Sequence, residues 1–491
     1  MITSSGTSTE PREQARVNNT YVWLISIVAA LGGLLFGYDW VVIGGAKPFF
    51  EPFFGITKTL VTDGVSRVIT DETMSGWANS CALLGCLVGS IITGGLSDKF
   101  GRKRLLIASA LLFAGSSILT GWAPNFYWFV GWRILGGVAI GMASNLSPMY
   151  IAEVAPAAQR GRLVAVNQLT IVIGILAAQI VNWWIAVKLP HPGVDAAAVE
   201  AARQVWNNAS GWRWMFTAVT APSLLFFAGA LLIPESPRWL IKNGMADRAR
   251  SVLARIGGER YSAAAVCDIE STIATDEIQR VRFRDLLEPR MKTILLVGVA
   301  LAVLQQWSGI NSIFNYAEEI YKSAGYRISD IMFNIVITGA INFVFTLLAI
   351  GTVDHLGRRA LMLIGCAGIG FSHLLIGIAY AQQMKGLAVL VFTLCALGCY
   401  GMSLAPVTWV LISEIFPNRI RGAAISIAVS ALWIACFVLT FMFPVLKGGI
   451  GMAKTFWLYS AICFAGLVFV YFRVPETKGK TLEQIEKELV D

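Results

Sequence analysis

Long apolar stretches constrain the fold of this chain more than any other feature. Residues 21–43, 331–353, 423–446 and 456–474 carry few or no charges, and such stretches approach the ~20 residues that a helix needs to cross about 30 Å of hydrocarbon. Only 14% of the residues are charged, against roughly 25% in typical soluble domains. Because backbone groups in lipid must be hydrogen-bonded internally, helices are the expected spanning elements. The sequence therefore predicts an all-α membrane protein.

Counted by length, the apolar stretches predict about twelve transmembrane helices. They lie at residues 21–43, 75–96, 105–121, 126–152, 163–186, 212–233, 293–321, 330–353, 360–381, 387–413, 423–446 and 455–474. Basic residues gather in every second loop, for example at 102–104, 160–162 and 419–421. This positive-inside bias predicts that both termini and the long central loop are cytoplasmic. It also accounts for the net charge of +9 without nucleic-acid binding.

The chain repeats its loop motifs. GGLSDKFGRK at 94–103 corresponds to IGTVDHLGRR at 350–359, and AEVAPAAQRG at 152–161 corresponds to SEIFPNRIRG at 413–422. IPES at 233–236 corresponds to VPET at 474–477, at a similar offset near half the chain length. Two six-helix halves related by parallel duplication, a known transporter construction, explain these matches. The predicted segments are a disordered cytoplasmic tail (1–19), an N-terminal six-helix bundle (20–233), a cytoplasmic helical linker (234–290), a C-terminal six-helix bundle (291–474) and a second cytoplasmic tail (475–491).

Charged residues recur at the cytoplasmic ends of both halves. An acid near one helix end can pair with an arginine near the next, and such pairs would hold the halves together on the inside until that side opens. The alternative is that the arginines only anchor the topology at the headgroups, although anchoring alone needs no duplicated carboxylates. The predicted cytoplasmic gate residues are Asp98, Arg102, Glu153, Arg160, Asp354, Arg358, Glu414 and Arg421.

These motifs resemble those of the major facilitator superfamily and, within it, the sugar porter family. The D-x-x-G-R-[KR] loops are superfamily-wide, whereas PESPRWL at 234–240, PETKG at 475–479 and GWR at 211–213 are marks of sugar porters. SPMYIAE at 147–153 resembles the bacterial xylose–proton symporters, and NQLTIVIGILAAQ at 167–179 resembles the mammalian facilitative glucose transporters. The resemblance covers effectively the whole chain. It implies a carrier that moves a monosaccharide, such as glucose or xylose, by alternating access.

Amides and aromatic rings lie inside the predicted spans, and Gly309 can interrupt the seventh span between several of them. Unpaired amides are costly in hydrocarbon, but they offer both donors and acceptors, which suits the hydroxyls of a neutral sugar better than an ion. Aromatic rings can cover the C–H face of a pyranose. The alternative is that these residues are helix–helix contacts and lipid-belt aromatics. This reasoning gives Phe36 as a binding residue. The resemblance points to the other predicted binding residues: Gln168, Gln305, Gln306, Asn311, Asn342, Trp409 and Trp433.

Three positions near this set depart from the pattern of the relatives. Ile175 stands where xylose symporters have a second glutamine, and Leu432 stands where an amide usually precedes Trp433. Asn315 replaces a usual tyrosine next to Tyr316, which in this family helps to close the outer gate. The preferred substrate therefore stays open among hexoses, pentoses and related polyols.

Asp39 is a carboxylate inside the first predicted span, and it needs a partner there. Arg133 is the best candidate, because it is the only arginine well inside a predicted first-half span. Protonation of Asp39 would release Arg133 and so couple proton binding to alternating access. The resemblance supports this interpretation, because an acid at this position marks most proton symporters of the family. The alternatives are a purely structural ion pair and uncoupled sugar uniport.

Other classes of protein receive less support from the sequence. H-E-x-x-H and G-x-S-x-G motifs and metal-ligand spacings do not occur, so no enzyme, cofactor or metal is expected. GKT at 479–481 resembles the end of a P-loop, but Val474 stands in place of its first glycine. A sugar sensor that does not transport remains an alternative, although the predicted tails are short. The chain is expected to work as a monomer in the lipid bilayer of a cell (inner or plasma) membrane, with a monosaccharide and a proton as its partners.

Overall fold

The computed structural model of the protein describes residues 17–62, 65–187, 196–278, 288–326, 328–384, 386–416 and 421–478. Within these ranges, twelve helical segments are long and apolar enough to cross a membrane. Six of them precede the linker and six follow it. The predicted all-α membrane fold of two halves joined by a helical linker is confirmed. Most of both predicted tails lies outside the described residues.

The elements follow one another along the chain with short connections. The N-terminal half contains α1 (Asn19–Phe53), β1 (Thr57–Thr62), β2 (Val65–Thr70), α2 (Glu72–Phe100), α3 (Arg102–Gly121), α4 (Phe126–Val154), α5 (Arg160–Val187), α6 (Ala196–Trp206), a π-helical segment (Asn207–Gly211), α7 (Trp212–Thr217) and α8 (Thr220–Leu232). The linker contains α9 (Pro237–Lys242) and α10 (Ala246–Ile278). The C-terminal half contains α11 (Pro289–Trp307), α12 (Ile310–Asn315), α13 (Ala317–Ser323), α14 (Ile328–Leu356), α15 (Arg358–Ala381), α16 (Leu387–Met402), α17 (Leu404–Ile415), α18 (Arg421–Ile450) and α19 (Met452–Arg473).

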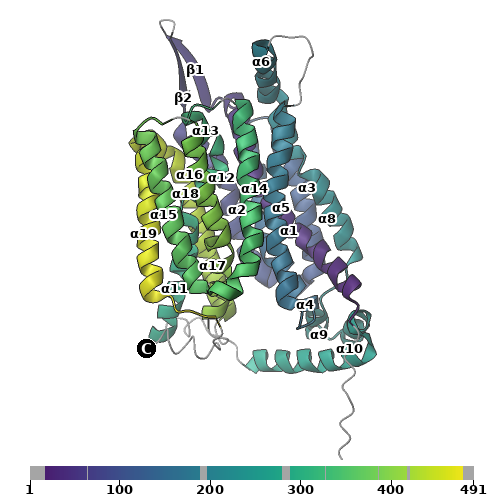
Figure 1. The fold of residues 1–491 in the computed structure, drawn as a ribbon. Coiled ribbons are helices and arrows are strands. Elements are labelled where there is room, and N and C mark those ends of the chain that lie inside the picture. Colours follow the sequence, from purple (N-terminus) through teal and green to yellow (C-terminus); the bar gives the residue numbers. More distant parts are fainter. Residues whose placement is uncertain are drawn as a thin grey trace, which may run out of the picture.

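The two halves stand side by side, and α10 lies across one end of them (Figure 1). We call this the linker end and the opposite end, which carries the β1–β2 hairpin and α6, the distal end. The halves meet where α2 packs against α18 and where α5 packs against α14. Helices from both halves therefore line the space in which a central site can form.

Small residues let α2 and α4 approach closely inside the N-terminal half. A Cβ atom on Gly85 would lie 2.0 Å from the backbone oxygen of Ile134, and one on Gly137 would lie 1.9 Å from that of Ala82. Close approach through small residues is a common way for helices to pack in membranes, where the lipid is as apolar as leucine. This packing holds the helix that carries Arg133 against α2.

The predicted spans do not include the β1–β2 hairpin. Its strands pair antiparallel, with Thr57 opposite Thr70 and Thr62 opposite Val65. Both strands are rich in threonine, valine and isoleucine, which favour extended backbone. Asp63 and Gly64 stand between them in the sequence, and this dipeptide favours two-residue hairpin loops.

Two helix boundaries bear on function. The seventh span is interrupted at Gly309, as predicted, and this residue has a left-handed φ of +85°. By contrast, α1 continues past the predicted end at Ile43 as far as Phe53. The added turns contain Lys47 and Glu51, which are 2% and 5% exposed. The helix continues through these charged residues, and both of them are paired inside the protein.

Candidate substrate site

The predicted partner of Asp39 is confirmed to be Arg133. The Arg133 Nη1 donates to Asp39 Oδ1 over 2.9 Å, and both residues are 3% exposed. Asp39 Oδ2 and Arg133 Nε have no hydrogen-bond partner among the described residues. Removing one member of such a buried pair leaves an uncompensated charge, which is strongly destabilising. The pair joins α1 to α4, and both helices belong to the N-terminal half.

Three aromatic rings meet where the halves face each other. Phe36 and Trp40 of α1 and Trp433 of α18 lie at ring-centroid distances of 6.0–6.1 Å from one another. The structure thus brings the two predicted rings Phe36 and Trp433 together, and it adds Trp40, which the sequence interpretation did not include. The indole nitrogen of Trp433 is buried and has no hydrogen-bond partner among the described residues. It is a donor available to a bound hydroxyl.

The amides of the seventh span form a chain on either side of the Gly309 break. Gln305 Nε2 donates to the backbone oxygens of Leu404 and Ala405, over 3.1 and 3.2 Å. Gln306 donates to Gln305, and Asn311 donates to Gln306. All three predicted amides are buried. Their mutual bonds hold their orientation, and each retains capacity for further hydrogen bonds.

Among the described residues, the remaining predicted binding residues form no hydrogen bond with this chain of amides. Asn342 on α14 is 3% exposed, and its Oδ1 lacks a partner within the described ranges. Gln168 on α5 is half-buried. Trp409 on α17 is 38% exposed. Their assignment to the site therefore stays a prediction.

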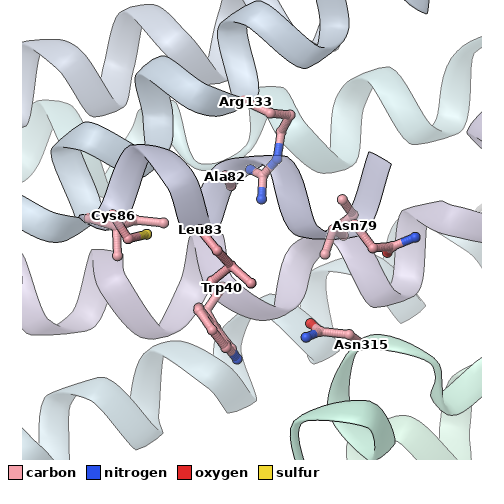
Figure 2. A pocket seen from close by; sticks show the side chains of 9 residues that line it. Trp40, Asn79, Ala82, Leu83, Cys86, Arg133 and Asn315 are labelled. Carbon is pink, nitrogen blue, oxygen red and sulfur yellow. The ribbon is translucent and has the colours of Figure 1, made fainter. Parts of the chain in front are cut away.

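A small pocket lies beside the Asp39–Arg133 pair (Figure 2). Arg133 and Asn315 point into it from opposite sides, and Trp40 lies at its edge (Figure 2). Oδ1 of Asn79 and Oδ1 of Asn315 are buried without partners in the described part of the chain. Asn315 belongs to the C-terminal half, so polar groups of both halves face this space. Its lining is Trp40, Ile43, Asn79, Ala82, Leu83, Cys86, Arg133, Ile140 and Asn315.

Tyr316 lies at the second break of the seventh span, between α12 and α13. Its hydroxyl donates to the backbone oxygen of Thr440 over 2.7 Å, and its ring centroid lies 4.7 Å from that of Phe443. Both partners are on α18. The side chain is fully buried, and its role as an outer gate stays a prediction.

At the linker end of the N-terminal half, Arg102 is the centre of an ion-pair cluster. It makes two hydrogen bonds of 3.0 Å to the carboxylate of Glu153 and pairs with Asp98 at 3.2 Å. Lys242 of α9 also pairs with Asp98, at 2.8 Å. Bidentate arginine–carboxylate pairs are among the stronger side-chain interactions. Arg160 is exposed at the start of α5.

The C-terminal half repeats part of this arrangement. Arg358 pairs with Glu414 at 3.3 Å, and Thr477 donates to the other oxygen of Glu414. The side chains of Asp354 and Arg421 lie outside the described residues. In both halves these pairs join helices of the same half. Their role as a gate between the halves stays a prediction.

The third repeated motif has a structural reason. Glu235 accepts the backbone N–H groups of Arg102 and Lys103, and Glu476 accepts those of Arg358 and Arg359. Each carboxylate thus caps the start of a helix, where negative charge is favoured. Burial raises the pKa of Glu476, but these backbone bonds outweigh burial and hold the pKa below its ordinary value.

Sequence reasoning missed two further groups of buried polar residues. Gln179 on α5 is 1% exposed, and neither of its amide atoms has a partner in the described ranges. A row of charged side chains at the distal end contains Lys47, Glu51, Glu72, Glu319 and Lys447. Their positions at the ends of apolar stretches resemble ordinary span ends, so local hydropathy holds no signal for their pairing.

The fold and the site define a class of protein: a multi-pass membrane carrier with polar groups between two helical halves. Comparison with known proteins gives the family. Residues 25–489 match the family described as "Sugar (and other) transporter", and the chain belongs to this family.

Several relatives match over nearly their whole length. The D-xylose-proton symporter of Escherichia coli is 36% identical, over 96% of this chain and 96% of its own. The glucose transport protein of a Synechocystis strain is 37% identical, over 96% of this chain and 98% of its own. The arabinose-proton symporter of Bacillus subtilis is 36% identical, over 95% of each.

Solved structures of the E. coli xylose transporter XylE share this fold. Its inward-open structure superimposes with a TM-score of 0.80 at 35% identity, covering 95% of this chain and 100% of that one. Its complex with 6-bromo-6-deoxy-D-glucose gives a TM-score of 0.76 at 35% identity, covering 96% of this chain and 100% of that one.

Proposed function

We propose that this protein carries a monosaccharide, a hexose or a pentose, across the membrane by alternating access. The observation that carries the proposal is the unpartnered indole nitrogen of Trp433, next to the rings of Phe36 and Trp40 where the two halves meet. Rings suit the C–H face of a sugar, and an unpaired donor suits its hydroxyls. The amides Gln305, Gln306 and Asn311, with Gln168, Asn342 and Trp409, complete the proposed site.

Transport is coupled to a proton through Asp39. Support comes from its buried pair with Arg133 and from the unpartnered Oδ2, which is open to protonation. Two of the relatives are named as proton symporters, of xylose and of arabinose. Uncoupled uniport is the alternative, and in that case the pair has a structural role only.

The linker end is the cytoplasmic side, and the membrane is the cell (inner or plasma) membrane. The similarity to the inward-open form of XylE, together with the closure of the distal end at Tyr316, supports this orientation. Positive residues at the linker end agree with it. The protein works as a monomer embedded in lipid, and its termini are cytoplasmic.

Uptake by proteoliposomes that contain the purified protein tests the proposal. Labelled xylose, glucose, galactose and inositol are offered separately, with and without an imposed pH gradient. We expect saturable uptake of at least one monosaccharide, and accumulation above equilibrium only when the outside is more acidic. Absence of uptake with every sugar would refute the carrier, whereas uptake that ignores the gradient would refute the coupling alone.

A further inference from the structure

Five charged side chains form an alternating row at the distal end, in the order Glu51, Lys47, Glu319, Lys447 and Glu72. Lys47 pairs with Glu51 at 3.3 Å and with Glu319. Lys447 pairs with Glu319 and, at 3.4 Å, with Glu72. The side chains of Lys47, Glu51 and Glu319 are 2%, 6% and 10% exposed. Such charges are placed in a protein interior only at a considerable cost in solvation.

This row crosses the boundary between the halves twice. Lys47 and Glu51 are on α1 and Glu72 is on α2, all in the N-terminal half. Glu319 is on α13 and Lys447 is on α18, both in the C-terminal half. The Lys47–Glu319 and Lys447–Glu72 pairs therefore join the halves. The Lys47–Glu51 and Lys447–Glu319 pairs lie within one half each.

Neighbouring groups contact Glu51 and Lys47, at one end of the row. Ser75 and Thr57 donate hydrogen bonds to the two carboxylate oxygens of Glu51. The ammonium of Lys47 lies 5.2 Å from the ring centroid of Tyr316, close enough for a cation–π contact. The row and the closed Tyr316 side chain thus belong to one contact surface between α1, α13 and α18.

We infer that Lys47, Glu319 and Lys447 are positioning residues of the transport reaction, which set the balance between the distal-closed and distal-open states. In the closed state, the two crossing pairs attract the halves across an interface in which Lys47–Glu319 is buried and Lys447–Glu72 is partly exposed. When the distal end opens, the attraction is lost but water solvates each charge again. The attraction between the charges favours the closed state, and their solvation favours the open state. Because these two large energies oppose each other, the two states are close enough in free energy for a bound solute to shift the equilibrium. The inference rests on the proposed alternating access.

Charge counting predicts the direction of the effect when Lys47 is neutralised. The row contains three carboxylates and two ammonium groups. Lys47→Met removes the partner of Glu51 and one of the two partners of Glu319, and it leaves Lys447 alone among three acids. The closed state then contains uncompensated buried charge, whereas the open state can hydrate it. We expect the population to shift toward the distal-open state by about tenfold or more.

Spin labels measure the shift directly. Val205 on α6 and Leu387 at the start of α16 are each 70% exposed, on different halves. Labels attached there through a ketone-bearing amino acid leave the native cysteines in place. In the purified, sugar-free protein, we expect Lys47→Met to move the distance distribution to longer values. Lys47→Arg, which keeps the charge, should leave the distribution as in the native protein.

Lys454→Met is the matched control. Lys454 is exposed near the start of α19, and the described ion pairs do not include it. The same substitution there should leave the distances unchanged. In proteoliposomes, Lys47→Met should lower both the KM for external sugar and the maximal rate, because more carriers face outward and fewer close. A purely structural defect would not lower KM.

Two results would overturn the inference. One is an unchanged distance distribution in folded Lys47→Met, and the other is an equal shift in Lys454→Met. If Lys47→Met does not fold, Lys447→Met tests the second crossing pair in the same way. The distance measurement needs no sugar transport, so its failure is distinguishable from failure of the proposed function.

Discussion

At the scale of single residues, the site depends on polar atoms that the fold leaves without partners. Asp39 Oδ2, the indole nitrogen of Trp433 and Asn342 Oδ1 are buried and unbonded within the described part of the chain. Buried polar atoms are normally hydrogen-bonded. A new hydrogen bond at any of these atoms would therefore lower the free energy. The two oxygens can accept from a bound ligand, and the indole N–H can donate to one.

Asp39→Asn should abolish accumulation of sugar against a gradient and leave sugar exchange intact. The amide cannot take up and release a proton, but it can still hydrogen-bond to Arg133. Proton-driven uptake and counterflow in proteoliposomes measure the two activities separately. Asp247→Asn is the control, because the Asp247 side chain is 99% exposed on the linker helix. If the native protein moves sugar without a proton, the coupling role of Asp39 is wrong.

Trp433→Phe should raise the KM for sugar by about tenfold, since a hydrogen bond to a hydroxyl contributes about 0.5–1.5 kcal/mol and 1.4 kcal/mol is a factor of ten. The substitution keeps an aromatic ring and removes only the N–H donor. Initial rates across a range of sugar concentrations give KM. Trp122→Phe, at a tryptophan that is 53% exposed, should change nothing. An unaffected KM in Trp433→Phe would exclude the indole nitrogen from sugar binding.

At the scale of elements, the seventh span shows how a helix break creates a site. Gly309 ends α11 and lets α12 start in a new direction, so that Gln305 and Gln306 precede the break and Asn311 follows it. The position tolerates only glycine for two reasons. Its φ is left-handed, and an added Cβ would lie 2.6 Å from the ring of Tyr459.

Gly309→Ala should therefore destabilise the protein. A left-handed backbone costs a residue with a Cβ about 1–2 kcal/mol, and the contact with Tyr459 adds to this. The apparent Tm in detergent should fall, and transport should fall with it. Gly131→Ala is the matched control, because a Cβ at Gly131 would meet nothing within 4 Å. Equal Tm values for both variants would show that the break does not need glycine.

At the scale of the whole molecule, the asymmetry between the two ends defines the state of the carrier. At the linker end, Arg102–Glu153 and Arg358–Glu414 lie within one half each, whereas at the distal end Lys47–Glu319 and Lys447–Glu72 cross between the halves. Among the described residues, the crossing ion pairs are thus found at the distal end. An alternating-access cycle requires this arrangement to reverse.

Gly76→Val should prevent closure of the distal end. A Cβ at Gly76 on α2 would lie 2.5 Å from the backbone oxygen of Phe441 on α18, so a larger side chain must separate the halves there. Overpacking costs about 1–3 kcal/mol, which corresponds to a decrease of roughly 5- to 150-fold in the maximal rate of transport. Equilibrium binding of sugar should persist.

Gly115→Val on α3 serves as control for this substitution, because a Cβ there would meet nothing within 4 Å. Transport rates and equilibrium sugar binding are measured for both variants. A native maximal rate in Gly76→Val would show that the α2–α18 contact can be lost without effect on the cycle.

Sequence patterns alone were enough to predict the spans, the duplication and the break at Gly309. These properties depend on local features: runs of apolar residues of bilayer length, repeated loop motifs, and a residue without a Cβ. The sequence also indicated the Asp39–Arg133 pair, because very few charges lie deep inside predicted spans. Of the candidate site, it predicted Phe36, Trp433 and the amides of the seventh span, which the structure brings into two groups.

Only the tertiary structure decided which charges join the halves. Lys47 and Glu319 are 272 residues apart in the sequence, and each stands at the end of an apolar stretch, where a charge normally meets water. Hydropathy is a local property, whereas neutralisation of a buried charge depends on a partner brought from another helix. The same reason explains why Trp40 and Asn315 were not assigned to the site.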